Sequence, residues 1–139
     1  MKMNQLPRGL RNHNPLNIRV SSTKWQGQDP VQSDKSFVQF ISNAYGYRAA
    51  FVTLRTYQQK YGLRTIAKMI GRWAPPNENN TASYIKRVAD GTGLDKDAQL
   101  PYTDKEHMVR MVMAMTVVEN GINAIKSEVE DGYKLAFGF

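Results

Sequence analysis

The sequence predicts a mainly α-helical protein in which an irregular N-terminal lobe precedes a set of helices. Its 139 residues suffice for one domain with a buried core and are too few for two, so we expect a single domain spanning residues 1–139. From residue 43 onward apolar side chains recur at helical spacing, whereas three prolines interrupt the first forty residues. The mean hydropathy is −0.54, and no run reaches the roughly 18 apolar residues of a membrane-spanning helix, so we expect no membrane insertion.

The first regular element is a long helix that starts at residue 43. The preceding stretch, residues 37–41, alternates imperfectly and is expected to be a short strand or an extended segment. The helix should stop at Gly62, because glycine is a common helix terminator. Its apolar positions are Ala44, Tyr47, Phe51, Leu54, Tyr57 and Tyr61.

Two shorter helices follow. Thr65 can cap the first of them, which must end before Pro75 because a residue that precedes proline is pushed out of the helical region. Residues 77–80 form a polar turn, and a second helix is expected over residues 81–89.

A capping box predicts the start of the next helix, since Thr103 is followed three residues later by Glu106. This helix should run to about Glu119 and stop at Gly121. Only Arg110 is charged between positions 108 and 118, so we expect it to be the buried central helix of the fold. A last helix is predicted over residues 127–136.

The net charge of +7 is concentrated in the N-terminal half. Residues 1–70 carry eleven Lys and Arg against two acids, a net +9, whereas residues 71–139 carry eight against ten, a net −2. The basic half could face nucleic acid, anionic lipid or an anionic cell-wall polymer. Because the chain has no cysteine, thiol catalysis and thiolate metal sites are excluded. It has only two histidines, His13 and His107, so a metal site would depend mostly on carboxylates. We expect no metal and no other cofactor.

Glu119 is the first candidate for a catalytic group. It lies at the end of the most hydrophobic helix, where burial and the negative end of the helix dipole both disfavour a charged carboxylate. Both effects favour the protonated form that a general acid needs near neutral pH. The alternative, which is the more frequent arrangement, is a solvated glutamate at a helix end.

Glu78 is the second candidate carboxylate. It lies on a loop that is stiffened by Pro75 and Pro76, and the amides of Asn79 and Asn80 beside it could bind a polar substrate such as a sugar. The alternative is local, because a glutamate favours the positive N-terminus of the helix that follows and asparagines cap it.

Aromatic residues are numerous, and aromatic faces line carbohydrate grooves or stack on bases. Those at helical spacing, such as Tyr57 and Tyr61, are more typical of a core. Trp25 has no periodic context and is the better candidate for a groove.

Residues 8–19 read Arg-Gly-Leu-Arg-Asn-His-Asn-Pro-Leu-Asn-Ile-Arg. This segment resembles the Arg-Gly-Ile-Arg-Asn-Asn-Asn-Pro-Gly-Asn-Ile-Arg opening of small lysozyme-like lysins of phages and prophages. The likeness continues through Trp-Gln-Gly at 25–27, Tyr-Gly-Tyr-Arg-Ala at 45–49, Trp-Ala-Pro-Pro-Asn-Glu-Asn-Asn-Thr at 73–81 and Glu-Asn-Gly at 119–121. His13 and Leu16 depart from the usual Asn and Gly, and the region after residue 121 matches poorly.

A looser likeness extends to glucosaminidases and lytic transglycosylases. In those enzymes a helix that ends in Glu-Ser-Gly precedes an Asn-Asn-Leu-Phe-Gly-Ile-Lys-like segment, whereas here the matching segment comes first and the helix ending at Glu119 comes last. This order implies a circularly permuted lysozyme-like fold. It requires Glu119 to lie beside residues 14–18 in space.

The resemblance implies a peptidoglycan-degrading enzyme that cleaves the glycan strand, with Glu119 as general acid and Glu78 as a second carboxylate. Hydrolysis and lytic transglycosylation are both compatible with the sequence. The implied partners are peptidoglycan glycan strands and components of a phage virion, and the implied place of action is the cell wall, reached without a conventional signal peptide. The implied substrate-binding residues are Asn14, Asn17, Trp25, Asn79, Asn80 and Tyr84.

Other functions compete with this one. A non-catalytic virion or wall-binding protein would keep the same fold without activity. The isoelectric point of about 9.7 suggests nucleic-acid binding, but no zinc-finger, RNP or helix-turn-helix signature accompanies the charge, so we expect no specific nucleic-acid partner. A lysin that cleaves peptide bonds lacks support, because no cysteine, metal cluster or Ser-His pair is present to supply its chemistry.

Overall fold

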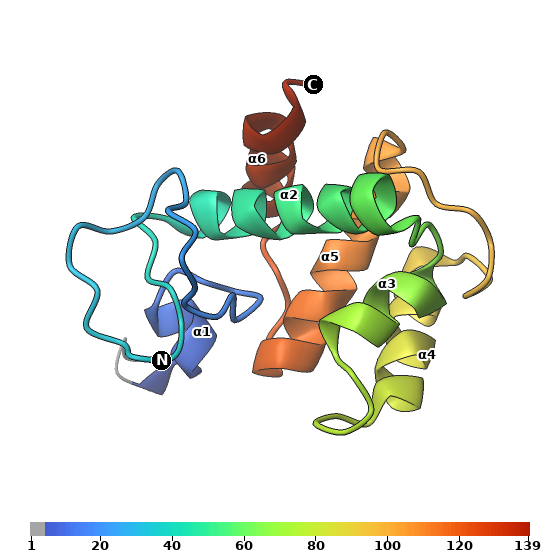
Figure 1. Ribbon diagram of the computed structural model, residues 1–139, viewed down its shortest axis with the longest axis horizontal. Helices are drawn as coiled ribbons and strands as arrows, with labels where there is room; N and C mark the ends of the chain where they lie inside the picture. Colours follow the sequence, from blue (N-terminus) through green and yellow to red (C-terminus); the bar gives the residue numbers. More distant parts are fainter. Residues whose placement is uncertain (1–4) are drawn as a thin grey trace.

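The computed structural model describes residues 5–139, and this part of the chain is mainly α-helical, as predicted (Figure 1). Strand pairing within it is limited to isolated bridges, among them Arg19 with Phe37 and Gln28 with Phe40. Residues 37–41 are therefore extended without forming a regular strand. The helices are α1 (Arg8–Arg11), α2 (Asn43–Tyr61), α3 (Ile66–Trp73), α4 (Thr81–Thr92), α5 (Lys105–Asn120) and α6 (Lys126–Phe137).

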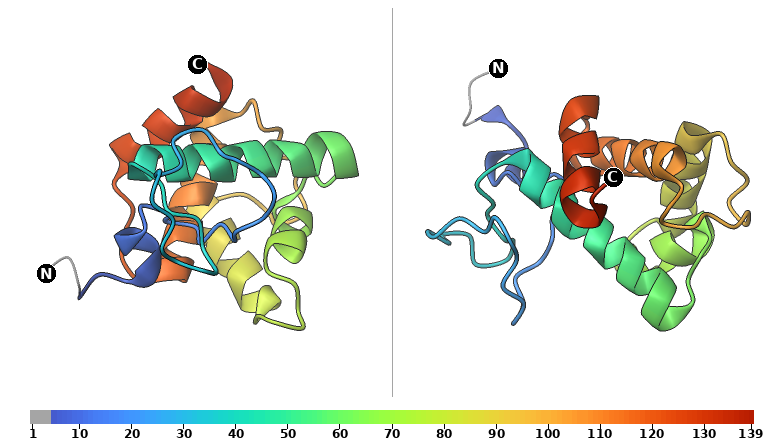
Figure 2. Two further views of the ribbon diagram at one scale, coloured as in Figure 1. Left: turned by 60° about the vertical axis from the view of Figure 1, so that its left-hand side comes forward. Right: turned by 90° about the horizontal axis from the view of Figure 1, so that it is seen from above.

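Helix α5 connects the two sides of the molecule. It contacts α1 and the irregular N-terminal lobe at one side and α4 at the other, while α2 runs across it and packs against α6, which crosses α2 at an angle (Figures 1 and 2). In Figure 1 the C-terminal end of α5 lies between α1 and the pair formed by α3 and α4. We call residues 5–42 the N-terminal lobe and α3 with α4 the helical lobe. The last turn of α5 lies between these two lobes.

The core gathers around α5, which confirms the prediction of a buried central helix. Its buried residues are Met108, Val109, Met111, Val112, Met115 and Thr116. The long helix α2 covers it, and the Tyr47 hydroxyl lies 3.0 Å from the Thr116 hydroxyl in the buried interface. Gly132 allows α6 to approach α2 closely, because a Cβ atom at position 132 would lie 2.4 Å from Cβ of Tyr47.

Most helix ends lie where the local signals predict them. The side chains of Thr65 and Asn80 cap α3 and α4, and Gly62 and Gly121 end α2 and α5 in the left-handed conformation. The prediction that Thr103 is the N-cap of α5 is wrong, because Asp104 occupies that position.

The carboxylate of Asp104 accepts a hydrogen bond from the backbone N–H of His107 at 3.2 Å and contacts the ring Nδ1 of the same residue at 2.8 Å. Glu106 pairs with Arg110 at 2.8 Å instead of reaching back to the helix start. The helix therefore begins one residue later than the capping box implies.

Helix α4 continues three residues beyond the predicted end at Ala89. The physical reason is tertiary: a Cβ atom at Gly91 would lie 2.8 Å from Cβ of Ala114, so this glycine lets α4 pack against α5 through its last turn. Gly93, at φ +76°, then ends the helix.

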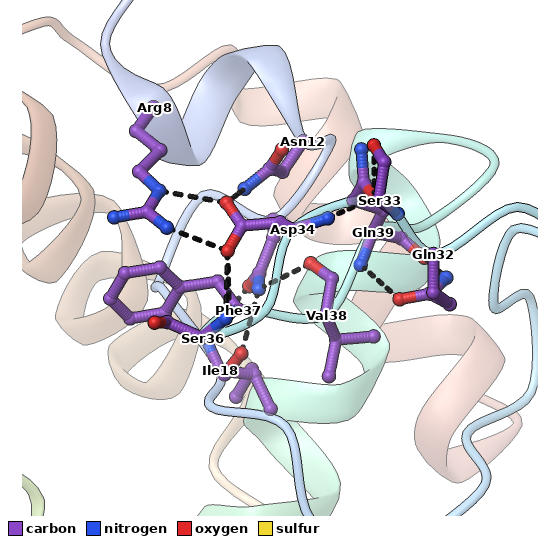
Figure 3. A network of polar contacts seen from close by, with 11 residues as sticks. Arg8, Asn12, Ile18, Gln32, Ser33, Asp34, Ser36, Phe37, Val38 and Gln39 are labelled. Atoms are coloured by element: carbon purple, nitrogen blue, oxygen red, sulfur yellow. Dashed lines mark hydrogen bonds and ion pairs between the residues drawn. The ribbon is translucent and has the colours of Figure 1, made fainter.

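The N-terminal lobe contains the short helix α1, which was not predicted because four residues are too few to show a period. Polar contacts hold this lobe together, and Asp34 is at their centre (Figure 3). Its carboxylate accepts hydrogen bonds from Nε and Nη2 of Arg8 at 2.7 and 2.6 Å and from Nδ2 of Asn12 at 3.0 Å. It also accepts from the backbone N–H groups of Ser36 and Phe37, so a single carboxylate ties α1 to the loop at residues 34–37.

We expect this contact to make the lobe sensitive to acid. The Arg8 guanidinium, together with the backbone N–H groups and Asn12, holds the pKa of Asp34 well below its usual range. A lowered pKa in the folded state contributes stability that is present above about pH 4 and is lost as the pH falls toward the lowered value. In urea unfolding, the stability difference between wild type and Asp34→Asn should therefore be larger at pH 7 than at pH 3. Asp90→Asn removes an exposed ion pair with Lys86 and should change stability little at either pH; an equal difference for Asp34→Asn at both pH values would contradict the expectation.

Candidate functional site

Two adjoining pockets meet at Glu119. The larger has a volume of about 510 Å³ and is lined by the N-terminal lobe, α2, α3 and the loop after α3. The smaller, of about 300 Å³, lies against α4. Glu119 and Asn79 line both pockets, so the carboxylate at the end of α5 faces the point where the two join.

Both oxygens of the Glu119 carboxylate accept hydrogen bonds from neutral donors. Nδ2 of Asn17 donates to Oε1 at 2.9 Å, and the Tyr84 hydroxyl donates to Oε2 at 2.9 Å. The donors come from the N-terminal lobe and from α4, so the half-buried carboxylate joins three distant parts of the chain. The spatial condition that the motif order imposes, Glu119 beside residues 14–18, is met.

Tyr84 is buried and remains a hydrogen-bond donor. Burial raises its pKa far above the ordinary value, and the neighbouring Glu119 carboxylate raises it further, while a hydrogen bond with the Trp73 side chain acts in the opposite direction. The phenol therefore keeps its proton at any physiological pH. This neutral group fixes the orientation of the carboxylate without adding a charge to the site.

A close-packed turn places Asn17. Its backbone has φ +56°, a left-handed conformation that asparagine tolerates better than most residues. Nδ2 of Asn120 donates to the carbonyl of Pro15 at 2.7 Å, which ties the turn to the end of α5. Gly9 leaves room for this contact, because a Cβ atom there would lie 2.8 Å from Oδ1 of both Asn17 and Asn120.

The two functions of Asn17, its backbone conformation and its side-chain hydrogen bond, can be separated by mutation. Asn17→Gly keeps the left-handed backbone and removes the amide, whereas Asn17→Ala removes the amide and strains the backbone. We expect both variants to lose the same share of any Glu119-dependent activity, and Asn17→Ala to be less stable than Asn17→Gly by about 1 kcal/mol. Thermal unfolding and activity assays on the two variants check this; equal stabilities would contradict it.

Asn14, which the resemblance implies as a substrate-binding residue, lines neither pocket. Its side chain is fully buried, and both ends of its amide are used. Nδ2 donates to the carbonyls of Ile18 and Val38 at 2.9 and 2.8 Å, and Oδ1 accepts from the backbone N–H of Ile18 at 2.9 Å. Asn14 therefore shapes the turn that carries Asn17.

The other predicted site residues lie around the two pockets. Trp25, half-buried, and the exposed Glu78 and Asn79 line the larger pocket, and Asn80 lines the smaller one. The Asn80 side chain also accepts a hydrogen bond from the N–H of Ser83 at 3.2 Å, so its predicted local role as a helix cap is confirmed. The carboxylate of Glu78 has no hydrogen-bond or ion-pair partner among residues 5–139.

Several pocket residues were not expected from the sequence. The helical spacing of Tyr57 favours a core position, yet Tyr57 lines the larger pocket together with Trp73. Their rings pack edge to face with centroids 6.4 Å apart. Arg87 gave no signal by itself, although Asn80, Ser83, Tyr84 and Arg87 follow the i, i+3, i+4, i+7 spacing of a single helix face.

Residues 5–139 bring no group of three or more His, Asp or Glu side chains into an arrangement that could hold a metal ion. Among the same residues, none of the helices combines the length and the apolar character needed to cross a membrane.

Comparison with known proteins identifies a relative from a virus. No known protein-family profile matches the chain. Protein P5 of Pseudoalteromonas phage PM2 is 39% identical to it over 140 residues, in an alignment that covers 98% of this chain and 86% of the phage protein. The chain therefore belongs to the family of phage proteins that includes Protein P5 of phage PM2.

Proposed function

We propose that the chain cleaves the glycan strands of peptidoglycan by general acid catalysis at Glu119, on a circularly permuted lysozyme-like fold. The observation that supports this most strongly is the position of Glu119. One half-buried carboxylate faces two joined pockets and is held on both oxygens by neutral donors, Asn17 and Tyr84. A general acid needs such a fixed orientation toward the oxygen that it protonates.

The surrounding side chains suit a carbohydrate. Aromatic rings, here Trp25, Tyr57 and Trp73, provide apolar faces for sugar rings, and the amide of Asn79 can bind hydroxyl or acetamido groups. The basic N-terminal half of the chain would be attracted to an anionic wall.

In the proposed reaction the protonated Glu119 gives its proton to the glycosidic oxygen as the bond to the leaving sugar breaks. A protonated carboxyl group keeps lone pairs that accept hydrogen bonds, so Tyr84 can go on donating to Glu119 while the carboxyl proton is directed at the substrate. Asn17 and Tyr84 are positioning residues in this scheme, since they act through the carboxylate.

Two outcomes of the bond cleavage are compatible with this site. In lytic transglycosylation a hydroxyl of the sugar itself attacks, and Glu119 alone takes both the acid and the base role. In hydrolysis water attacks, and Glu78, whose carboxylate lines the same pocket, is the available second carboxylate.

The products of purified peptidoglycan test the proposal. We expect soluble muropeptides in mass spectrometry; 1,6-anhydro ends identify a transglycosylase and reducing ends a hydrolase. Sedimentation of the protein with peptidoglycan without any soluble product would contradict the proposal and support a wall-binding virion protein. Salt-dependent binding to random DNA, with neither wall binding nor product, would support the nucleic-acid alternative.

A further inference from the structure

Arg87 is the cationic side chain in the smaller pocket. It lies on the face of α4 that also carries Asn80, Ser83 and Tyr84, and all four residues line this pocket together with Glu119. Arg87 is three residues, about 4.5 Å, beyond Tyr84 along the axis of α4. Because the Tyr84 hydroxyl contacts Glu119, Arg87 lies on the same side of α4 as the reacting carboxylate, three residues further along.

The guanidinium of Arg87 is exposed and has no acidic partner among the described residues. Asp90, the acid nearest to it along α4, pairs with Lys86 at 2.8 Å. No ion pair joins Arg87 to Glu119, although both line the pocket. An arginine in this state has five donors free for a ligand that enters from solvent.

The ligand that matches this group is a carboxylate. A guanidinium forms two parallel hydrogen bonds with a carboxylate, which makes the pair both stronger and more selective than a contact with a hydroxyl. A glycan of the chitin type carries only hydroxyl and acetamido groups. Peptidoglycan differs on every second sugar, where a lactyl group either ends in a carboxylate or carries a peptide that has carboxylates of its own.

We infer that Arg87 binds a carboxylate carried by the muramyl sugar beside the cleaved bond, with Asn80 and Ser83 as neutral neighbours. The inference rests on the proposed function, because it takes the glycan strand as the ligand of the joined pockets. It makes the smaller pocket the part of the site that distinguishes peptidoglycan from neutral glycans.

Binding to three glycans of equal length tests this in the Glu119→Gln background, where no cleavage interferes. The glycans are strands with stem peptides, strands stripped of peptides that keep free lactyl carboxylates, and neutral chitin oligosaccharides. We expect Arg87→Gln to weaken binding to at least one of the two anionic glycans by about 3- to 10-fold and to leave chitin binding unchanged. Loss on peptide-bearing strands alone identifies a stem-peptide carboxylate, and loss on stripped strands alone identifies the lactyl group. Added salt should reduce the effect.

Arg64→Gln is the matched control, because Arg64 is exposed and lines neither pocket. It removes the same charge and should leave all three affinities unchanged. Equal weakening by Arg64→Gln and Arg87→Gln, an equal loss on chitin, or no binding of any glycan would overturn the inference. If the Arg87 effect is found while wild type releases no product from peptidoglycan, the inferred binding site stands and the proposed catalytic function fails.

Discussion

Replacing Glu119 with glutamine is expected to reduce the release of muropeptides by at least about 100-fold, which is the lower end of what a positioned general acid contributes. The amide cannot supply a proton to the glycosidic oxygen. Its shape matches that of the carboxyl group, so the pockets should stay unchanged.

The hydrogen bonds around position 119 can survive this substitution. The amide oxygen of glutamine can accept from Asn17, and its NH₂ can donate to the hydroxyl of Tyr84, which is also an acceptor. The thermal unfolding midpoint should therefore remain close to that of wild type. Unfolding curves and circular dichroism of the variant distinguish lost chemistry from lost structure.

Two further glutamates serve as controls for this variant. Glu106 is exposed at the other end of α5, and Glu106→Gln should leave activity unchanged. Glu78→Gln separates the two mechanisms: a transglycosylase should keep most of its activity, whereas a hydrolase that uses Glu78 as its base should lose it. If Glu119→Gln retains full activity, the assignment of the acid is wrong.

Replacing Asn14 with alanine is expected to destabilise the fold by about 2 kcal/mol or more. The substitution leaves two buried backbone groups without partners, namely the carbonyl of Val38 and the N–H of Ile18. The carbonyl of Ile18 keeps the hydrogen bond that it accepts from the N–H of Val38 at 3.0 Å. Each buried polar group left unpaired costs about 1–3 kcal/mol. Denaturant unfolding measures the loss directly.

The same variant should also lose activity, because the turn held by Asn14 carries Asn17 to Glu119. Asn123→Ala, at an exposed asparagine outside the network, is the control and should stay within about 0.5 kcal/mol of wild type. A loss below about 1 kcal/mol for Asn14→Ala would show that water replaces the amide and that the turn forms without it.

Comparison of individual elements shows which features the sequence could predict. The helices at residues 43–61 and 66–73 were predicted closely, because their caps and glycine stops act within a few residues. The start of α5 was assigned to Thr103, since two neighbouring residues could both cap it and only the contact with His107 favours Asp104. The resemblance counts Asn14 among the substrate-binding residues, and a sequence by itself does not distinguish a buried amide from an exposed one.

By itself, the sequence determined the helical class, most helix limits and the short set of carboxylates available for chemistry, because these depend on composition and on interactions over a few residues. Only the tertiary structure decided that Glu119, Asn17 and Tyr84 share hydrogen bonds, that Tyr57 and Trp73 line a pocket, and that Arg87 lines a pocket together with Glu119. These contacts join residues as many as 102 positions apart. They depend on how α5 packs between the two lobes, and no local pattern of residues determines that packing.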